Sequence, residues 1–220
     1  MRADWITRGD GKRLILYFGG WGMDERSVSH LKSDSDVLAF HDYRDIASAP
    51  PDATGYEAVD VVAWSMGVWA ASESLGRWGI IPRRAVALNG TGRPVDDLQG
   101  IPTVLYALTE RGMNERGWEK FIDRALVSRE ERALFCANCQ PRRDPRERLE
   151  ELRRVREQSS CARPAIPWSR AFISNKDIIF PAENQRNWWQ GRCEIATLAG
   201  GHYPFFRFTC WESIIDYGNR

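Results

Sequence analysis

The sequence lacks three features that would each indicate a broad class of protein. Its 31 basic residues are balanced by 30 acidic residues, and the formal net charge of +1 argues against a basic nucleic-acid-binding protein. No apolar run approaches the roughly 20 residues of a membrane-spanning helix, so no membrane partner is expected. The first residues, MRADWITRGDGKR, are charged and contain no apolar core of a secretory signal, so we expect a cytoplasmic location.

Cysteine and histidine are also too sparse for an evident metal site. The five cysteines are expected to be reduced thiols, and the three histidines lie far in sequence from the C-x-x-C pair Cys136 and Cys139. A zinc site needs a second pair or nearby histidines, and a thioredoxin-like motif needs a preceding strand. We therefore expect no metal and no cofactor, and interpret the pair as two small, half-buried side chains.

Short apolar segments alternate with helix-like segments along much of the chain. Strand-like runs lie at 13–18, 37–40, 59–64, 85–88, 103–108, 171–173 and 195–198. Helix-like spacing is found at 24–32, at 66–78, where Gly79 ends it, and at 205–215. Continuous apolar strands separated by helices predict an α/β fold with a mostly parallel sheet covered on both faces.

The region from about residue 110 to residue 163 is densely charged and has no strand pattern. Its apolar residues recur at helical spacing in two groups, Trp118, Phe121, Ile122 and Ala125, then Leu149, Leu152 and Val155. Gln140 and Pro141 mark a turn between them. We predict a single domain of 220 residues, with a core at about 1–109 and 164–220 and a helical lid inserted at about 110–163.

A serine stands where the strand at 59–64 meets the helix at 66–78. The stretch VVAWSMGVW places Ser65 in a pattern close to the reactive-serine turn G-x-S-x-G, with Ala63 at the first glycine position and Gly67 at the second. A hydroxyl on such a turn projects from the carboxyl edge of the sheet, beside the free N–H groups of a helix N-terminus. The motif alone is weak, and an ordinary buried strand end is the alternative.

A base and an orienting acid follow Ser65 in the chain order of α/β-hydrolases. Asp177 lies in ISNKDIIFP after the strand at 171–173, and His202 lies in AGGHYP after the last strand. Each could alone be an ordinary loop residue, but three such residues at three strand ends predict a catalytic triad. His30 and His41 are the rival bases, and we interpret them as surface or packing histidines.

The glycine-rich stretch FGGWGM at 18–23 follows the first long strand. We expect its Trp21 N–H and the Met66 N–H to form an oxyanion hole, so that these two residues contact the substrate together with Ser65 and His202. The alternatives are an ordinary turn or a phosphate cradle. However, the stretch is not G-x-G-x-x-G, and it has no Walker lysine.

These motifs resemble those of the short pimeloyl-acyl-carrier-protein methyl ester esterases of biotin synthesis, the BioG type, in the α/β-hydrolase superfamily. The shared stretches are LILYFGGWG (14–22), VAWSMGVW (62–69), NGTGxPxDD (89–97), SNKDxIF (174–180) and GHYxFxRFTxW (201–211). The resemblance implies that Ser65 is the nucleophile, Asp177 the acid and His202 the base. The implied reaction releases methanol from a methyl pimeloyl chain attached through phosphopantetheine to an acyl carrier protein.

The arginine-rich segment 142–163 suggests where such a carrier would dock. It holds eight arginines against five acidic residues, and acyl carrier proteins are strongly acidic. We name Arg142, Arg143 and Arg146 as candidate contacts; a solvated amphipathic helix is the alternative. A different esterase or acyl thioesterase, or a binding protein without turnover, also fits the sequence, and we expect a monomer that binds no nucleic acid.

Overall fold

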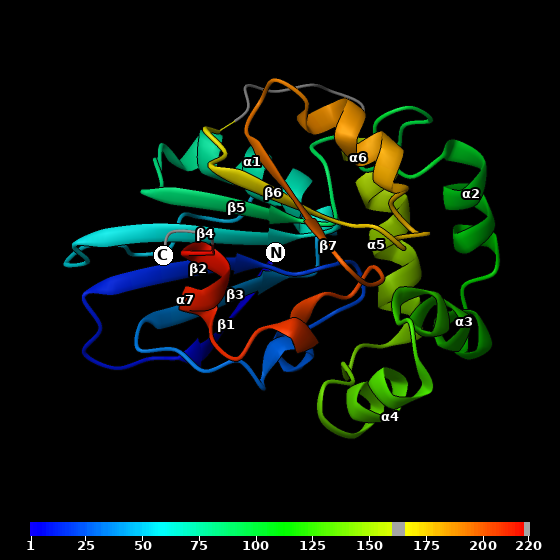
Figure 1. Cartoon of the computed structure of the whole chain (residues 1–220), viewed down its shortest axis with the longest axis horizontal. Coiled ribbons are helices and arrows are strands. Elements are labelled where there is room, and N and C mark those ends of the chain that lie inside the picture. The colour runs from blue at the N-terminus through cyan, green and yellow to red at the C-terminus, as the bar shows by residue number, and fades with distance from the viewer. Residues whose placement is uncertain (160–165, 218–220) are drawn as a thin grey trace.

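The computed structural model describes residues 1–159 and 166–217 and has a seven-stranded sheet at its centre (Figure 1). The strands are β1 (Arg2–Thr7), β2 (Arg13–Phe18), β3 (Asp36–His41), β4 (Ala58–Trp64), β5 (Arg84–Leu88), β6 (Arg170–Ser174) and β7 (Glu194–Leu198). Their order is β1-β3-β2-β4-β5-β6-β7, and every pair is parallel except β1 with β3. The expected α/β fold with a mostly parallel sheet is therefore confirmed.

Helices cover both faces of this sheet. The helix α1 (Met66–Trp78) packs on β2 and β4, and α7 (Trp211–Ile215) lies across the opposite face (Figure 1). A further helix, α6 (Ala182–Trp189), packs on β6 and β7. Because both faces are covered, the last five residues of β2 are buried, as a continuous apolar strand predicts. Within residues 1–159 and 166–217, no helix is long and apolar enough to cross a membrane.

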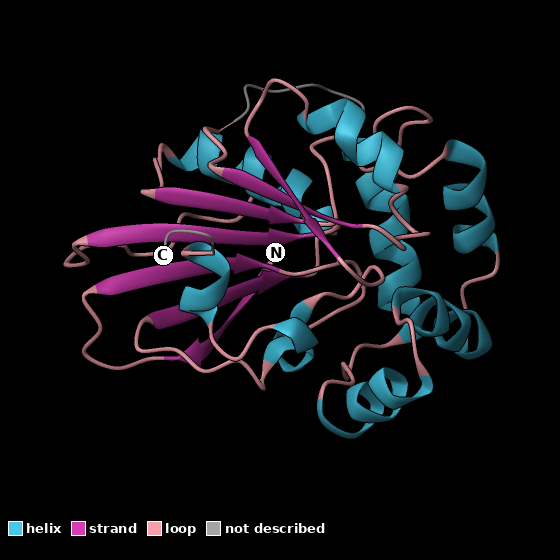
Figure 2. Cartoon of the chain, viewed as in Figure 1, coloured by secondary structure: helices cyan, strands magenta, loops and turns pink. Residues whose placement is uncertain are grey.

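Four helices lie together beyond the carboxyl ends of the parallel strands (Figure 2). They are α2 (Thr103–Arg111), α3 (Glu115–Ala125), α4 (Arg129–Asn138) and α5 (Pro145–Gln158). The side chains of Asn114, Ser128 and Asp144 cap the last three by accepting backbone N–H bonds. The buried residues of α3 are the four that the helical spacing identified. The division into core and lid stays a prediction, and the boundary at residues 163 and 164 lies outside the described residues.

The expected strand at 103–108 is wrong, because this segment forms α2. Only Tyr106 of this helix is buried, whereas Val104, Leu105 and Leu108 are 67%, 42% and 55% exposed. A central strand would bury all of them, and a short apolar run does not distinguish strand from helix by its periodicity.

Two other expected helices are shorter than predicted. Only Glu25–Val28 of the segment 24–32 is helical, as a 3-10 turn, and 205–215 divides into a 3-10 turn at Phe205–Arg207 and α7. The sequence analysis also missed β1 and α6, whose polar residues hide any clear period.

Candidate active site

Ser65 occupies a strained turn between β4 and α1. Its φ of 58° and ψ of −126° are unusual for a residue with a side chain, and this strain is found at functional sites. The helix begins one residue after Ser65. At this tight turn, the backbone of Gly67 lies against that of Phe18, and the backbone of Gly90 lies against that of Ser65. A Cβ on Gly67 would lie 2.1 Å from the Phe18 carbonyl oxygen, and one on Gly90 would lie 2.2 Å from the Ser65 carbonyl oxygen. Glycine is therefore required at both positions, whereas Ala63 fits within β4, fully buried.

The structure brings Ser65, His202 and Asp177 together in one hydrogen-bonded chain. His202 Nε2 lies 2.9 Å from Ser65 Oγ, and His202 Nδ1 lies 2.9 Å from Asp177 Oδ2. The three residues come from the loops that follow β4, β7 and β6, and all are buried. Because a carboxylate only accepts hydrogen bonds, we assign the imidazole proton to Nδ1, which leaves Nε2 as an acceptor toward the serine hydroxyl.

The Asp177 carboxylate is held by three further donors. Its Oδ1 accepts the backbone N–H groups of Ile179 and Phe180 at 2.9 and 3.0 Å. Its Oδ2 accepts Gln185 Nε2 of α6 at 3.0 Å, in addition to His202. The orientation of the carboxylate is thus fixed by the backbone of its own loop and by a side chain of α6. The sequence analysis missed Gln185, and nothing in its helical surroundings marks it.

A second set of bonds holds the loop that carries His202. Asn89, at the end of β5, donates through its amide to the carbonyl of His202 at 2.9 Å and accepts the Ser174 N–H at 2.7 Å. Trp64 Nε1 donates to the same His202 carbonyl at 2.8 Å. The His202 loop is therefore held by Trp64 at the end of β4 and by Asn89 after β5, and Asn89 is itself fixed by Ser174 at the end of β6. Asn89 was also missed, although its place directly after a strand was the available signal.

The two expected oxyanion donors lie in neighbouring segments. Met66 is the first residue of α1, and Trp21 follows β2, and both line the same pocket. Among the described residues, neither backbone N–H has an acceptor. The loop around Trp21 is held by α5: Trp21 Nε1 donates to the Arg148 carbonyl at 2.7 Å, and Gly22 N–H donates to Glu151 Oε2 at 3.2 Å.

Glu151 is fully buried and joins this loop to an ion network. It accepts the Tyr43 N–H at 2.9 Å and pairs with Arg143 at 2.6 Å, and Arg143 also lies 3.2 Å from Asp42. Arg143 is only 5% exposed, so the expectation that it contacts a carrier protein needs correction: it is a structural counter-ion. Arg142 and Arg146 are exposed, and Arg163 lies outside the described residues.

A narrow apolar pocket of about 30 Å³ adjoins the site. Trp21 and Met66 line it beside Ser65, and the exposed side chains of Leu105 and Ile178 line it at the surface. Tyr106 also lines it and donates through its hydroxyl to the Leu152 carbonyl at 2.8 Å. Burial raises the pKa of Tyr106 well above its ordinary value, so the hydroxyl stays neutral.

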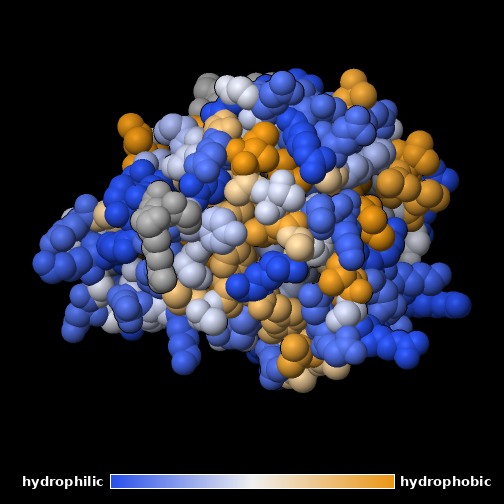
Figure 3. Space-filling model, viewed as in Figure 1, coloured by the Kyte–Doolittle hydropathy of each residue, from blue (hydrophilic) through white to orange (hydrophobic). Residues whose placement is uncertain are grey.

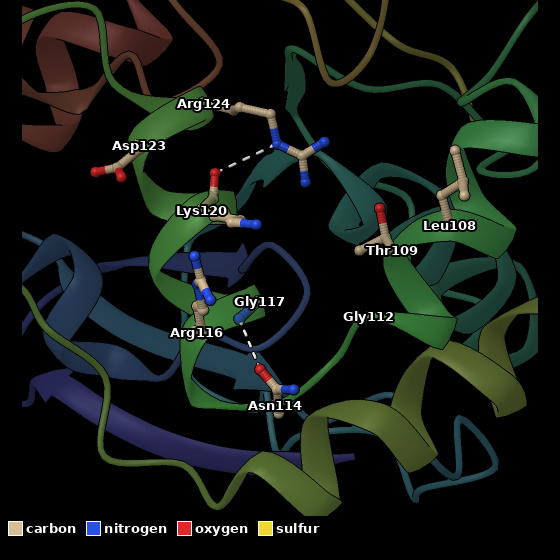
Figure 4. A pocket seen from close by; sticks show the side chains of 9 residues that line it. All are labelled: Leu108, Thr109, Gly112, Asn114, Arg116, Gly117, Lys120, Asp123 and Arg124. Carbon is tan, nitrogen blue, oxygen red and sulfur yellow. Dashed lines mark hydrogen bonds between the residues drawn. The ribbon is translucent and has the colours of Figure 1, made fainter.

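A wider groove of about 580 Å³ lies between α2 and α3 (Figure 4). Its lining includes Leu108 and Thr109 from α2 and three cationic residues of α3, Arg116, Lys120 and Arg124. Thr109 and Arg124 line both this groove and the apolar pocket, so the two spaces share a wall.

The remaining histidines and the cysteine pair lie outside the chain of Ser65, His202 and Asp177. His41 Nε2 bonds Asp4 at 2.7 Å, and His30 Nε2 lies 3.2 Å from the Phe205 carbonyl. Burial lowers the pKa of His30, with the bond to Phe205 acting in the opposite direction. The interpretation of the cysteine pair as two half-buried side chains is wrong: Cys136 is exposed, whereas Cys139 is buried with its Sγ 3.5 Å from His30 Nδ1.

One group of side chains has the composition of a metal site. Asp4, Glu25 and His41 present ligand atoms within 4.8 Å of one another. Two of these three residues already form the His41–Asp4 hydrogen bond. The group lies near the sheet edge formed by β1, apart from Ser65.

Comparison with known proteins identifies close relatives. The model of the family described as "Pimeloyl-ACP methyl esterase BioG" matches residues 1–214. The crystal structure of BioG from Haemophilus influenzae superposes with a TM-score of 0.90 at 34% identity, covering 98% of this chain and 100% of that one. An uncharacterized protein of H. influenzae is 37% identical over 212 residues, which are 94% of this chain and 96% of that protein.

A longer relative and a more distant structure complete the comparison. The malonyl-[acyl-carrier protein] O-methyltransferase of Bacteroides fragilis is 38% identical over 195 residues, which are 87% of this chain but only 40% of that protein. The chain thus spans less than half of this relative. The α/β hydrolase MGS-M2 from a deep-sea metagenome has a TM-score of 0.62 at 13% identity, covering 94% of this chain and 88% of that one, and shows the shared fold alone.

Proposed function

The chain belongs to the BioG family of pimeloyl-acyl-carrier-protein methyl esterases, which act in biotin synthesis. We propose that Ser65 is the nucleophile with which it hydrolyses the methyl ester of the pimeloyl chain on the acyl carrier protein. The observation that carries this proposal is the hydrogen-bonded chain from Ser65 through His202 to Asp177, with both links at 2.9 Å. This arrangement can generate an alkoxide-like nucleophile at a buried strand end, which ester cleavage requires.

In the first half-reaction, Ser65 Oγ attacks the ester carbonyl while His202 Nε2 accepts its proton. Asp177 keeps the proton on Nδ1 and stabilises the imidazolium that forms. The negative charge that develops on the carbonyl oxygen is stabilised by the N–H groups of Met66 and Trp21, which have no acceptor among the described residues. His202 then protonates the departing methoxide, so methanol leaves and an acyl group remains on Ser65.

In the second half-reaction, water replaces methanol. His202 Nε2 takes a proton from this water, which attacks the acyl carbonyl and forms a second tetrahedral intermediate at the same oxyanion donors. The proton returns to Ser65 Oγ as the acyl–oxygen bond breaks. The product is a free carboxylate at the far end of the pimeloyl chain, still attached to its carrier.

The apolar pocket and one relative support an acyl substrate on a carrier protein. The apolar lining of this pocket, which includes Ile101, Leu105 and Phe121, favours contact with methylene groups over contact with a polar substrate. The name of the Bacteroides relative describes methyl transfer to an acid on an acyl carrier protein, which makes an ester of the kind that an esterase removes. The transferase activity itself belongs to that longer protein.

The test uses methyl pimeloyl-acyl carrier protein and follows its mass. Demethylation removes a CH₂ equivalent and leaves the acyl chain attached, whereas a thioesterase would release the whole chain from the carrier. We expect demethylation by the parent, and Ser65→Ala, His202→Ala and Asp177→Asn to lower the rate by about three or more orders of magnitude. A parent that leaves the ester intact, or a Ser65→Ala variant with a normal rate, would refute the proposal.

A further inference from the structure

The helix α6 carries two hydrogen-bond donors on its buried face. Gln185 and Trp189 are four residues apart, so they lie one above the other on the same side of the helix, and they are 0% and 1% exposed. The residues of the opposite side are exposed, namely Glu183, Arg186, Asn187 and Gln190. The surface over this helix is accordingly largely hydrophilic (Figure 3). The two buried donors therefore act on the interior of the molecule, where each has an acceptor.

Gln185 binds the acid of the proposed triad directly. Its Nε2 donates to Asp177 Oδ2 at 3.0 Å and to the Phe180 carbonyl at 2.7 Å. Both neighbours are acceptors, so we assign the NH₂ group to that side of the amide. The amide oxygen is buried and has no hydrogen-bond partner among the described residues. Such an atom lowers stability, so this glutamine has a cost that an apolar side chain would avoid, and its role lies in the carboxylate that it holds.

Gln185 binds the same carboxylate oxygen that faces the imidazole. Asp177 Oδ2 lies 2.9 Å from His202 Nδ1, and it accepts the bond from Gln185 as well. The other oxygen, Oδ1, accepts two backbone N–H groups of its own loop. The backbone therefore fixes one oxygen, and the bond from α6, strengthened by the charge of the carboxylate, fixes the oxygen on which the position of His202 depends.

Trp189 holds the segment that supports the turn of Ser65. Its Nε1 donates to the Gly90 carbonyl at 2.9 Å. The backbone of Gly90 lies directly against Ser65, because a Cβ on Gly90 would be 2.2 Å from the Ser65 carbonyl oxygen and 2.8 Å from its Cα. Ser65 and Asn89 have positive φ angles of 58° and 46°, so both segments are strained. A shift of the Gly90 peptide would therefore move the Ser65 turn.

The helix is itself held by the loop at 97–100. Asn184 Nδ2 donates to the carbonyls of Asp97 and Gly100 at 3.0 and 2.9 Å. Asn187 Nδ2 donates to the Leu98 carbonyl at 3.2 Å. Together with the packing of α6 on β6 and β7, these bonds keep the buried face of the helix in one position relative to the sheet.

We propose that α6 is a positioning element of the candidate active site, through Gln185 for the acid and Trp189 for the turn of the nucleophile. This inference rests on the proposed function, because it assigns roles relative to Ser65, His202 and Asp177. Neither Gln185 nor Trp189 lines the apolar pocket, so both act through other residues. One holds the carboxylate toward the imidazole, and the other holds the hydroxyl toward it. The two 2.9 Å bonds of the triad are thus supported from one helix.

The experiment removes each donor and keeps the shape of the side chain as far as possible. Gln185→Met has no amide, and Trp189→Phe keeps an aromatic ring without the N–H group. On dimethyl pimelate, we expect kcat to fall at least about tenfold in Gln185→Met and at least about threefold in Trp189→Phe. KM should stay within about twofold of the parent, because the triad geometry changes and the substrate contacts do not. The rate is expressed per folded enzyme, with the folded fraction measured by circular dichroism.

The same helix offers a matched control for each variant. Gln190→Met makes the same chemical change at an exposed position. Trp188→Phe makes the second change at a ring that lies against Gly92 and under the Arg192 guanidinium, outside the triad contacts. Both controls should keep kcat and KM within about twofold of the parent.

The outcomes separate this inference from the proposed function. A parent-like kcat in Gln185→Met would overturn the role of Gln185, since the backbone bonds of Asp177 would then suffice, and a parent-like kcat in Trp189→Phe would overturn the role of Trp189. A loss shared by the controls, or a change in KM as large as that in kcat, would mean that α6 only stabilises the fold. If Gln185→Met does not fold, Gln185→Leu replaces it with the same expected loss. A parent inactive on both dimethyl pimelate and methyl pimeloyl-carrier protein would instead overturn the proposed function.

Discussion

Glu151 provides the sharpest test of how α5 supports the candidate active site. Its carboxylate has no exposure and accepts the N–H groups of Gly22 and Tyr43 as well as the Arg143 guanidinium. Gly22 follows Trp21, whose N–H is the proposed oxyanion donor. Replacing Glu151 with alanine therefore removes one buried charge and frees the loop that positions this donor.

The expected loss of stability follows from the burial of the pair. Removing one partner of a buried ion pair costs about 3–5 kcal/mol, because the other charge stays buried without compensation. The N–H groups of Gly22 and Tyr43 would also lose their acceptor. We expect Glu151→Ala to lower the free energy of unfolding by about 4 kcal/mol, measured by urea titration. Glu150→Ala is the matched control: its side chain is 57% exposed and pairs with Arg44, so we expect less than about 1 kcal/mol.

The catalytic consequence is separable from the loss of stability. Loss of a whole oxyanion donor lowers kcat by about 10² to 10³-fold, so a loosened Trp21 loop should lower it by at least about tenfold. The double variant Arg143→Met/Glu151→Leu removes both charges and should recover the part of the stability that the uncompensated Arg143 charge costs. Its kcat on a small methyl ester should stay low, because Gly22 still has no acceptor. A Glu151→Ala variant with near-parent stability and kcat would refute this reasoning.

Three further predictions address the turn, the histidine loop and the acid stability. Gly67→Ala places a Cβ 2.1 Å from the Phe18 carbonyl oxygen, so the free energy of unfolding in urea should fall by about 3 kcal/mol; an unchanged value would mean that the turn can open. Asn89→Ala should lower kcat about tenfold with little change in KM, because it loosens the His202 loop. An unchanged kcat in steady-state kinetics would mean that the Trp64 hydrogen bond alone holds this loop. Burial alone would raise the pKa of Asp42, but hydrogen bonds from Arg44 and the charge of Arg143 hold it below 3.8, so its contribution to stability is present above about pH 4 and lost on acidification. Asp42→Asn should therefore flatten the fall in stability as the pH drops below about 4, and an unchanged slope would contradict this assignment.

Several features of the molecule could be predicted from the sequence because they depend on short segments. The apolar run before Ser65 and the helical spacing after it predict the bounds of α1, Met66–Trp78, and β4 starts one residue earlier than predicted. The positions of Asp177 and His202 after two strands follow from the same kind of pattern, because parallel strands bring their carboxyl ends to one edge. The family resemblance rests on these same short motifs and is confirmed by the match over residues 1–214.

Only the tertiary structure decided which polar residues support that site. Gln185 and Glu151 lie on helices with no local mark of their role. Glu151 acts on Gly22, which is 129 residues away in the sequence, and Gln185 acts on Asp177 from a helix that the sequence did not predict. The same holds for Arg143, whose buried pairing with Asp42 and Glu151 excludes it from the surface. The segment 103–108 is apolar enough for a strand, but it forms α2. Each central strand of the sheet already has a neighbouring strand on both sides, so the segment has no place among them. Local spacing determines which elements can form, whereas burial and long-range hydrogen bonds determine which charges remain free to bind a partner.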